Sequence, residues 1–126
     1  MVGMTKAKIK ARAAIESLYI GKCSIIQYQD ITDATTKLTR KGEVVVAENL
    51  PCRLSFELLS KAQQSDTAAG ISQVVKLILA PEIDVMTGSK IVIEQNEKSF
   101  VYQVSGVPAV YYSHQEILLD IFRGWS

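Results

Sequence analysis

Residues 90–104 read KIVIEQNEKSFVYQV, two runs of alternating apolar and polar side chains joined by a short polar turn. Alternation with a period of two places successive side chains on opposite faces of a strand. The stretch therefore predicts a hairpin with strands at 90–95 and 99–104 around a turn at 96–98. The apolar positions on the two strands are Ile91, Ile93, Phe100, Tyr102 and Val104.

The same period runs through most of the chain after residue 22. Further strands are expected at 23–30, 43–48, 52–57, 71–80 and 115–122. Asn49-Leu50-Pro51 is expected to separate the second of these strands from the third, and 31–42 reads as the long arm of a hairpin. The side chains expected to face the core include Cys52, Leu54, Phe56, Val75, Leu77, Leu79, Ile117, Leu119 and Ile121.

Six or seven short strands with turn signals between them predict a mainly β fold, a small antiparallel β-barrel or a sandwich. A barrel is favoured because closure removes edge strands. The chain is expected to form a single domain over 1–126, with the barrel at 22–126 and a flanking α-helical segment at 1–21.

The helix is expected over residues 4–19, where apolar residues recur at spacings of three and four. Lys6, Lys8, Lys10 and Arg12 crowd its first turns, where the helix dipole disfavours positive charge. Two interpretations remain open: a solvated face, or a surface for an acidic partner or nearby DNA phosphates.

Composition excludes several classes of protein. The 126 residues include 14 Lys plus Arg and 13 Asp plus Glu, so the net charge of +1 argues against a dedicated nucleic-acid or membrane-surface protein. No apolar run approaches a membrane span, and no signal peptide is visible at the N-terminus.

Residues with the chemistry of an active site are few. His114 is the only histidine, and neither a nucleophile motif nor a phosphate loop accompanies it. Cys23 and Cys52 are expected to be free buried thiols, with a disulfide as the alternative. We therefore expect no catalytic residues, no metal site and no cofactor, and a protein that is not an enzyme.

Residues 58–70 differ from the rest because they are small and polar and lack a strand period. A loop of this length in a compact domain is uncommon, and such loops are often functional or mobile. A functional loop and a neutral insertion are both consistent with the sequence.

Four segments carry a resemblance to a known family: Val44–Phe56, Gln73–Pro81, Gly88–Tyr102 and the ending His114–Trp125. In this order they resemble the head-closure, or head–tail connector, neck proteins of tailed bacteriophages and prophage-like elements, in the versions found in prophages of Gram-positive bacteria. The likeness covers about residues 22–126 and contains no catalytic signature. The basic N-terminal helix varies among such proteins.

The resemblance implies a structural protein of the virion or phage-like particle, assembled in the cytoplasm of the bacterial host. It would form a homo-oligomeric ring beneath the portal or an adaptor ring, hold the packaged DNA inside the head and present a surface to tail-completion or tail proteins. The free subunit could be a monomer, DNA would be a neighbour only by proximity, and no membrane is involved.

The resemblance also implies roles for particular residues. The candidate channel-closing loop comprises Ser60, Lys61, Ala62, Gln63, Gln64, Ser65, Asp66, Thr67, Ala68, Ala69 and Gly70. The candidate subunit or partner contacts are Asp33, Lys37, Arg40, Lys41, Arg53, Arg123 and Trp125. Trp125 is interpreted either as packed against the barrel or as an interface anchor.

Two other functions remain as alternatives. One is a tail-completion or minor capsid protein of the same particle. The other is a small-barrel binder of single-stranded nucleic acid, in which Tyr102, Tyr111, Tyr112 and Lys98 would supply aromatic and basic contacts.

Overall fold

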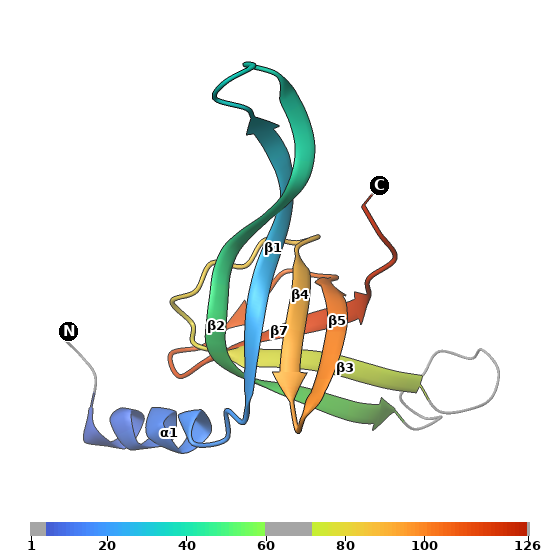
Figure 1. The fold of residues 1–126 in the computed structure, drawn as a ribbon. Helices are drawn as coiled ribbons and strands as arrows, with labels where there is room; N and C mark the ends of the chain where they lie inside the picture. The colour runs from blue at the N-terminus through green and yellow to red at the C-terminus, as the bar shows by residue number, and fades with distance from the viewer. Residues whose placement is uncertain (1–4, 60–71, 126) are drawn as a thin grey trace.

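The computed structural model describes residues 5–59 and 72–125. Within these residues a single helix precedes seven strands, all of them antiparallel to their partners (Figure 1). The mainly β fold with an N-terminal helix that the sequence predicts is confirmed. The elements are α1 Lys6–Glu16, β1 Gly21–Thr32, β2 Thr39–Leu59, β3 Ser72–Leu79, β4 Lys90–Gln95, β5 Lys98–Val104, β6 Ala109–Val110 and β7 Gln115–Ile121.

Six of the strands pair in a closed ring, in the order β2-β1-β4-β5-β7-β3 and back to β2. We call this ring the body. The pairing of β3 with β7, from Val75↔Leu119 to Leu79↔Gln115, closes it. The two-residue strand β6, which the sequence did not predict, pairs only with β7. Within the described residues, no helix is both long and apolar enough to cross a bilayer.

The core lies inside the ring and follows the predicted alternation. Its fully buried apolar side chains include Ile25, Leu77, Leu79, Ile91, Ile93, Val104 and Ile117. Two inward positions were predicted wrongly: Phe56 is 43% exposed and Ile121 is 59% exposed. Both lie toward the ends of their strands, and Ile121 makes the last pair of β7 with β5, so the ring covers them incompletely.

The expected break at residues 49–51 is absent, since β2 runs without interruption from Thr39 to Leu59. Asn49 adopts a left-handed backbone with φ 55°, and the register with β1 shifts around Ile25. Such irregularities bend a strand without ending it. The bend transfers β2 from β1, its partner as far as Cys52, to β3, its partner from Cys52 onward. Pro51 is tolerated here because β2 has one strand neighbour at that position.

Gln95 takes the place of a strand partner at this transfer. Its side chain is buried, accepts a hydrogen bond from Leu54 N at 2.8 Å and donates one to Leu54 O at 3.0 Å. Gly21 leaves room for it, because a Cβ there would lie 3.0 Å from Gln95 Oε1. The amide therefore satisfies backbone groups of β2 after that strand has left β1.

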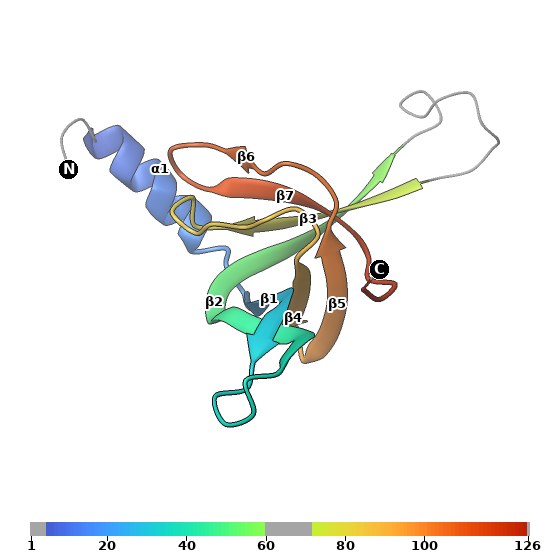
Figure 2. The same cartoon turned by 90° about the horizontal axis from the view of Figure 1, so that it is seen from above.

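The helix α1 is shorter than predicted and lies beside the body (Figures 1 and 2). Thr5 caps it by accepting from Lys8 N at 3.2 Å, and none of its residues is buried. Polar contacts hold it: Arg12 bridges Glu16 and Glu82, and Lys8 lies over the Tyr112 ring. The apolar spacing that predicted the helix therefore does not reflect burial in the core.

Cys23 and Cys52 are free thiols buried in the core, as the sequence predicts. The hydrogen bond with the Cys52 thiol and the burial both raise the pKa of Cys23. A thiol that stays protonated in an apolar interior is a poor nucleophile, so Cys23 is a packing residue.

Candidate interaction surface

A two-stranded arm projects beyond the body (Figure 1). It comprises residues 27–45, the distal part of β1, the turn 33–38 and the first part of β2. The strand β4 pairs with β1 only as far as Ile26, and β3 pairs with β2 only from Cys52. Within the described residues the arm therefore has no strand neighbour on either side.

Local hydrogen bonds shape the tip of the arm. Asp33 Oδ1 accepts from Thr35 N at 2.7 Å and from Thr36 N at 3.2 Å, a turn that short acidic side chains favour. Lys37 has a left-handed backbone with φ 63°. The predicted long connection at 31–42 is therefore corrected: residues 31–32 and 39–42 belong to the strands, and only 33–38 form the turn.

An aromatic cluster supports the base of the arm. Tyr28 stacks on Trp125 with ring centroids 5.1 Å apart, and Phe122 meets Trp125 edge-on at 5.1 Å. Glu43 Oε2 accepts hydrogen bonds from Trp125 Nε1 at 2.8 Å and from Lys90 Nζ at 2.9 Å. The C-terminal segment is thereby attached to the arm, and Trp125 packs within this chain.

The two hydrogen bonds also change the pKa of Glu43. The bonds from Lys90 and then from Trp125 lower the pKa of this exposed carboxyl. A lowered pKa means that the folded protein favours the ionised form. The attachment is therefore present at neutral pH and is lost as the pH falls through the folded-state pKa.

We expect the fluorescence of Trp125, the only tryptophan in the chain, to be constant near neutral pH and to change only in acid, below the ordinary range of a glutamate pKa, because the pKa of Glu43 is lowered. Protonation of Glu43 removes the charge that attracts Lys90 and weakens the acceptor of the indole N–H. The measurement is a fluorescence titration of the parent beside Glu43→Gln, which has no carboxyl at this position. An unchanged acid transition in Glu43→Gln would show that another group controls the tryptophan.

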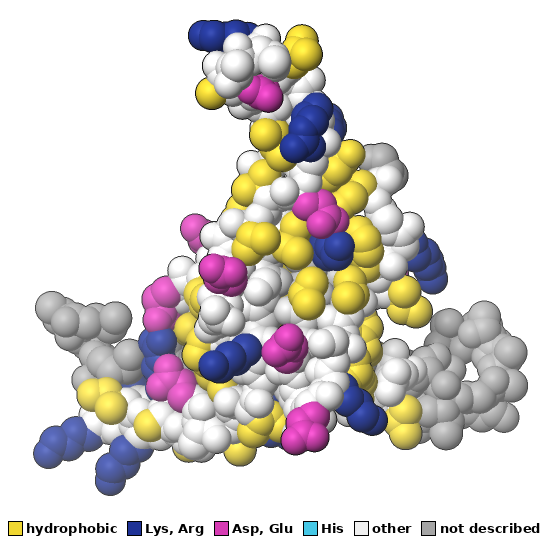
Figure 3. All heavy atoms as spheres, viewed as in Figure 1, with side chains coloured by type: hydrophobic (Ala, Val, Ile, Leu, Met, Phe, Trp, Pro, Cys, Tyr) yellow, Lys and Arg dark blue, Asp and Glu magenta, His cyan; other side chains and the backbone are white. Residues whose placement is uncertain are grey.

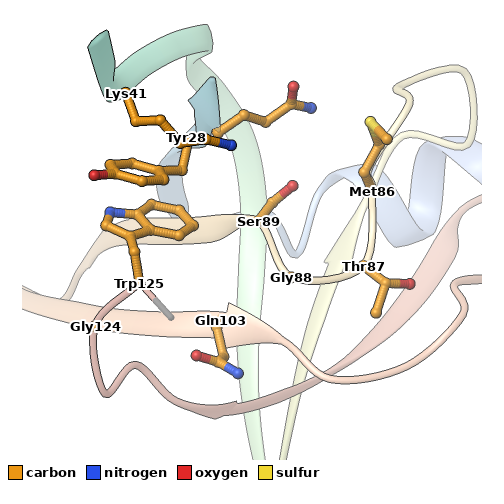
Figure 4. A pocket seen from close by; sticks show the side chains of 10 residues that line it. Tyr28, Lys41, Met86, Thr87, Gly88, Ser89, Gln103, Gly124 and Trp125 are labelled. Carbon is orange, nitrogen blue, oxygen red and sulfur yellow. The ribbon is translucent and has the colours of Figure 1, made fainter. Parts of the chain in front are cut away.

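A hollow of about 410 Å³ opens beside the arm (Figure 4). Tyr28 and Trp125 line one side of it, and the turn 86–89 lines the other. Ser89 is 97% buried, and its Oγ has no hydrogen-bond partner in the part of the chain that the structure describes. Lys41 also contributes to the lining. The hollow thus combines an aromatic wall with an unsatisfied buried hydroxyl.

The predicted contact residues fall into separate groups. Asp33, Lys37, Arg40 and Lys41 all lie in the arm. Trp125 lies at its base, and Arg123 belongs to the same C-terminal segment. Arg53 lies apart from the arm, half-buried where β2 pairs with β3. The candidate channel-closing loop, Ser60–Gly70, lies outside the described residues.

The stack of Tyr28 on Trp125 and the role of Gln95 were not predicted from the sequence. Tyr28 sits in an ordinary strand pattern, so only the nearby C-terminal tryptophan could have drawn attention to it. Gln95 gives a weak signal, because it is the polar residue at an inward position of the alternating strand 90–95.

His114 lies in a row of polar side chains. Its Nδ1 is 2.8 Å from Ser113 Oγ, its Nε2 is 2.9 Å from Glu116 Oε2, and its ring stacks on Tyr111. Ser113 is buried, and Glu116 also lies 3.8 Å from Lys76 Nζ. The row links His114 and Ser113, just before β7, to Glu116 on β7 and Lys76 on β3. Among residues 5–59 and 72–125, no cluster of His, Cys, Asp or Glu is suited to a metal ion.

The fold and this surface define a small antiparallel β protein with a flanking helix and a projecting two-stranded arm. No protein-family model matches the chain, and no curated protein matches it. A solved structure to which it is similar is the phage-like element PBSX protein xkdH from Bacillus subtilis. The TM-score is 0.45 and the sequence identity 12%, over 78% of this chain and 90% of that chain. The fold is therefore defined by the pairing of its own strands.

Proposed function

We propose that this protein is a structural component of a tailed phage or prophage-like particle, which forms a ring in the neck and closes the head. The observation that carries the proposal is the arm, whose two edges have no strand neighbour among the described residues. Unpaired strand edges are recognition elements for other chains, and soluble monomers usually protect them. The resemblance of residues 44–56, 73–81, 88–102 and 114–125 to neck proteins supports the same function.

In this proposal the body acts as a rigid block and the arm as the assembly element. Rings with cyclic symmetry need two different complementary patches on each subunit. The opposite edges of one arm supply two such patches. The partners are the portal or adaptor ring above, the tail-completion proteins below and further copies of this chain. The resemblance assigns closure of the channel to residues 60–70.

The alternative of a tail-completion or minor capsid protein uses the same surface at another place in the particle. The alternative of a single-stranded nucleic-acid binder has less support, because its aromatic residues are engaged within the chain. Tyr102 is half-buried and stacks on Phe100, Tyr111 stacks on His114, and Tyr112 lies under Lys8. We further propose that the protein turns over no substrate.

Deletion of the gene tests the proposal. In cells that make the particle, we expect near-complete loss of DNA-filled heads joined to tails, with restoration by the parent gene. Electron microscopy and measurement of nuclease-resistant DNA in the particle fraction provide the readout. A gold label on an epitope tag should lie at the neck. A label along the tail or over the shell would favour the first alternative, and normal particles without the protein would contradict both structural roles.

A further inference from the structure

We propose that the arms of neighbouring copies pair edge to edge, the β1 edge of one copy with the β2 edge of the next. The occupant of each edge is thus a second copy of this chain. The inference rests on the proposed ring and deepens it by naming the contact. Because the strands of one arm are antiparallel, arms that point the same way would bring β1 of one copy antiparallel to β2 of its neighbour. The result would be one continuous sheet around the ring.

The backbone of the arm leaves hydrogen-bonding groups available for this pairing. Asp33 N donates to Leu38 O at 2.9 Å, which marks a hydrogen-bonded pair at the end of the ladder. In an antiparallel ladder, hydrogen-bonded and non-hydrogen-bonded pairs alternate. The pairs Thr32↔Thr39, Asp30↔Lys41 and Tyr28↔Glu43 therefore turn their N–H and C=O groups away from the arm. All six of these residues are exposed.

The hollow lies in line with such an added strand. The last pair between β1 and β4 is Ile26↔Lys90, and the hollow is lined by the next residues on each side, Gln27 and Ser89. A strand added along the free edge of β1 would therefore lie beside β1 on the same side as β4, beyond the end of β4, and would pass Ser89. In Figure 4 the Ser89 side chain points into this space.

Charge favours pairing of unlike edges, the β1 edge of one copy with the β2 edge of the next. The β1 side of the arm carries Asp30 and Asp33, while the β2 side carries Arg40 and Lys41. Glu43 also lies on the β2 side, but its carboxylate is bonded to Lys90 and Trp125. Asp30 and Lys41 lie only 3.9 Å apart within one arm, and both remain about two-thirds exposed. Pairing β1 with β1 would oppose acidic residues, and pairing β2 with β2 would oppose basic residues, and both arrangements are unfavourable. Pairing β1 with β2 opposes unlike charges. It also leaves one β1 edge and one β2 edge of the assembly free, so that further copies can add until the ring closes.

Apolar exposure on β2 supports the same contact. Val45 is 53% exposed and Val46 is 43% exposed, on the part of β2 that has no partner on its outer side. Figure 3 shows hydrophobic side chains on the surface where the arm meets the body. Edge strands of monomers usually avoid exposed aliphatic residues because these promote pairing with other chains. A neighbouring β1 would cover this stretch.

A photo-crosslinker placed on one edge tests the inference without assuming a register. We would replace Asp30 with benzoyl-phenylalanine, irradiate assembled particles, and identify the crosslinked peptides by mass spectrometry. The expected product has twice the mass of the chain and joins position 30 to the segment 39–46 of another copy. The matched control carries the same group at Lys98, at the opposite end of β4 from the arm, and should give no product with 39–46.

The outcomes separate the two proposals. If the protein is present in the neck and position 30 crosslinks to another protein or to another segment, the pairing of arms is wrong and the neck function stands. If the protein is absent from the particle, the neck function fails, and the ring pairing fails with it.

Proline substitution provides a second, independent test. Asp30→Pro and Lys41→Pro each remove one outward N–H and leave the hydrogen bonds within the arm in place. We expect each variant to melt within a few degrees of the parent and to lower the number of copies per particle at least about tenfold. Asp30→Ser, which keeps the N–H, should assemble. Normal assembly of both proline variants would overturn the inference.

Discussion

Gln95→Ala is expected to lower the free energy of unfolding by about 2–5 kcal/mol. The side-chain amide of Gln95 is buried and bonds both Leu54 N and Leu54 O, at 2.8 and 3.0 Å. Alanine would leave these two buried backbone groups without partners, and each unsatisfied group costs about 1–3 kcal/mol. The measurement is chemical denaturation followed by circular dichroism.

Gln29→Ala is the matched control for this prediction. Gln29 is exposed, and its side chain bonds the exposed side chain of Gln27, so its loss should change the free energy of unfolding by less than about 0.5 kcal/mol. Equal effects of the two substitutions would show that the amide of Gln95 does not serve as the missing strand partner of β2.

Leu77→Ala is also expected to lower the free energy of unfolding by about 2–5 kcal/mol. Leu77 is fully buried and lies on β3 between its partners Leu54 on β2 and Ile117 on β7. A cavity at this position would lie beside the pairing that closes the ring, where strands on both sides limit collapse. Urea denaturation with an unchanged m-value would show that stability alone is affected.

The control for this position is Leu118→Ala on the outer face of β7. Leu118 is 48% exposed, so its truncation should cost less than about 1 kcal/mol. A loss at Leu118 as large as that at Leu77 would mean that the outer face of β7 is covered, for example by a partner subunit.

The alternation along the chain was sufficient to predict most strands and their inward faces. The strand 90–95 has its predicted bounds, and Ile91 and Ile93 are fully buried. The burial of Cys23 and Cys52 follows from the same pattern. These predictions succeed because a period of two reports which side chains leave water, and burial of apolar surface dominates the energy of each strand.

The candidate site was only partly predictable. The contact residues at 33–41 do lie together, because they are close in sequence and share one hairpin. The stack of Tyr28 on Trp125 joins residues about three quarters of the chain length apart, and no local pattern encodes such a contact. The helix was predicted from its apolar spacing, but it is shorter than predicted, and none of its residues is buried.

By itself, the sequence determined that the chain after residue 22 forms strands, where most of them run and which of their faces lie inward. Only the tertiary structure decided that β3 pairs with β7 to close the ring and that β2 bends through residues 49–51 without ending. It also decided that Gln95 bonds the backbone of β2 at Leu54, where β2 no longer pairs with β1. The physical reason is that side-chain patterning specifies an environment, whereas strand partners are chosen by backbone hydrogen bonds between segments far apart in the chain.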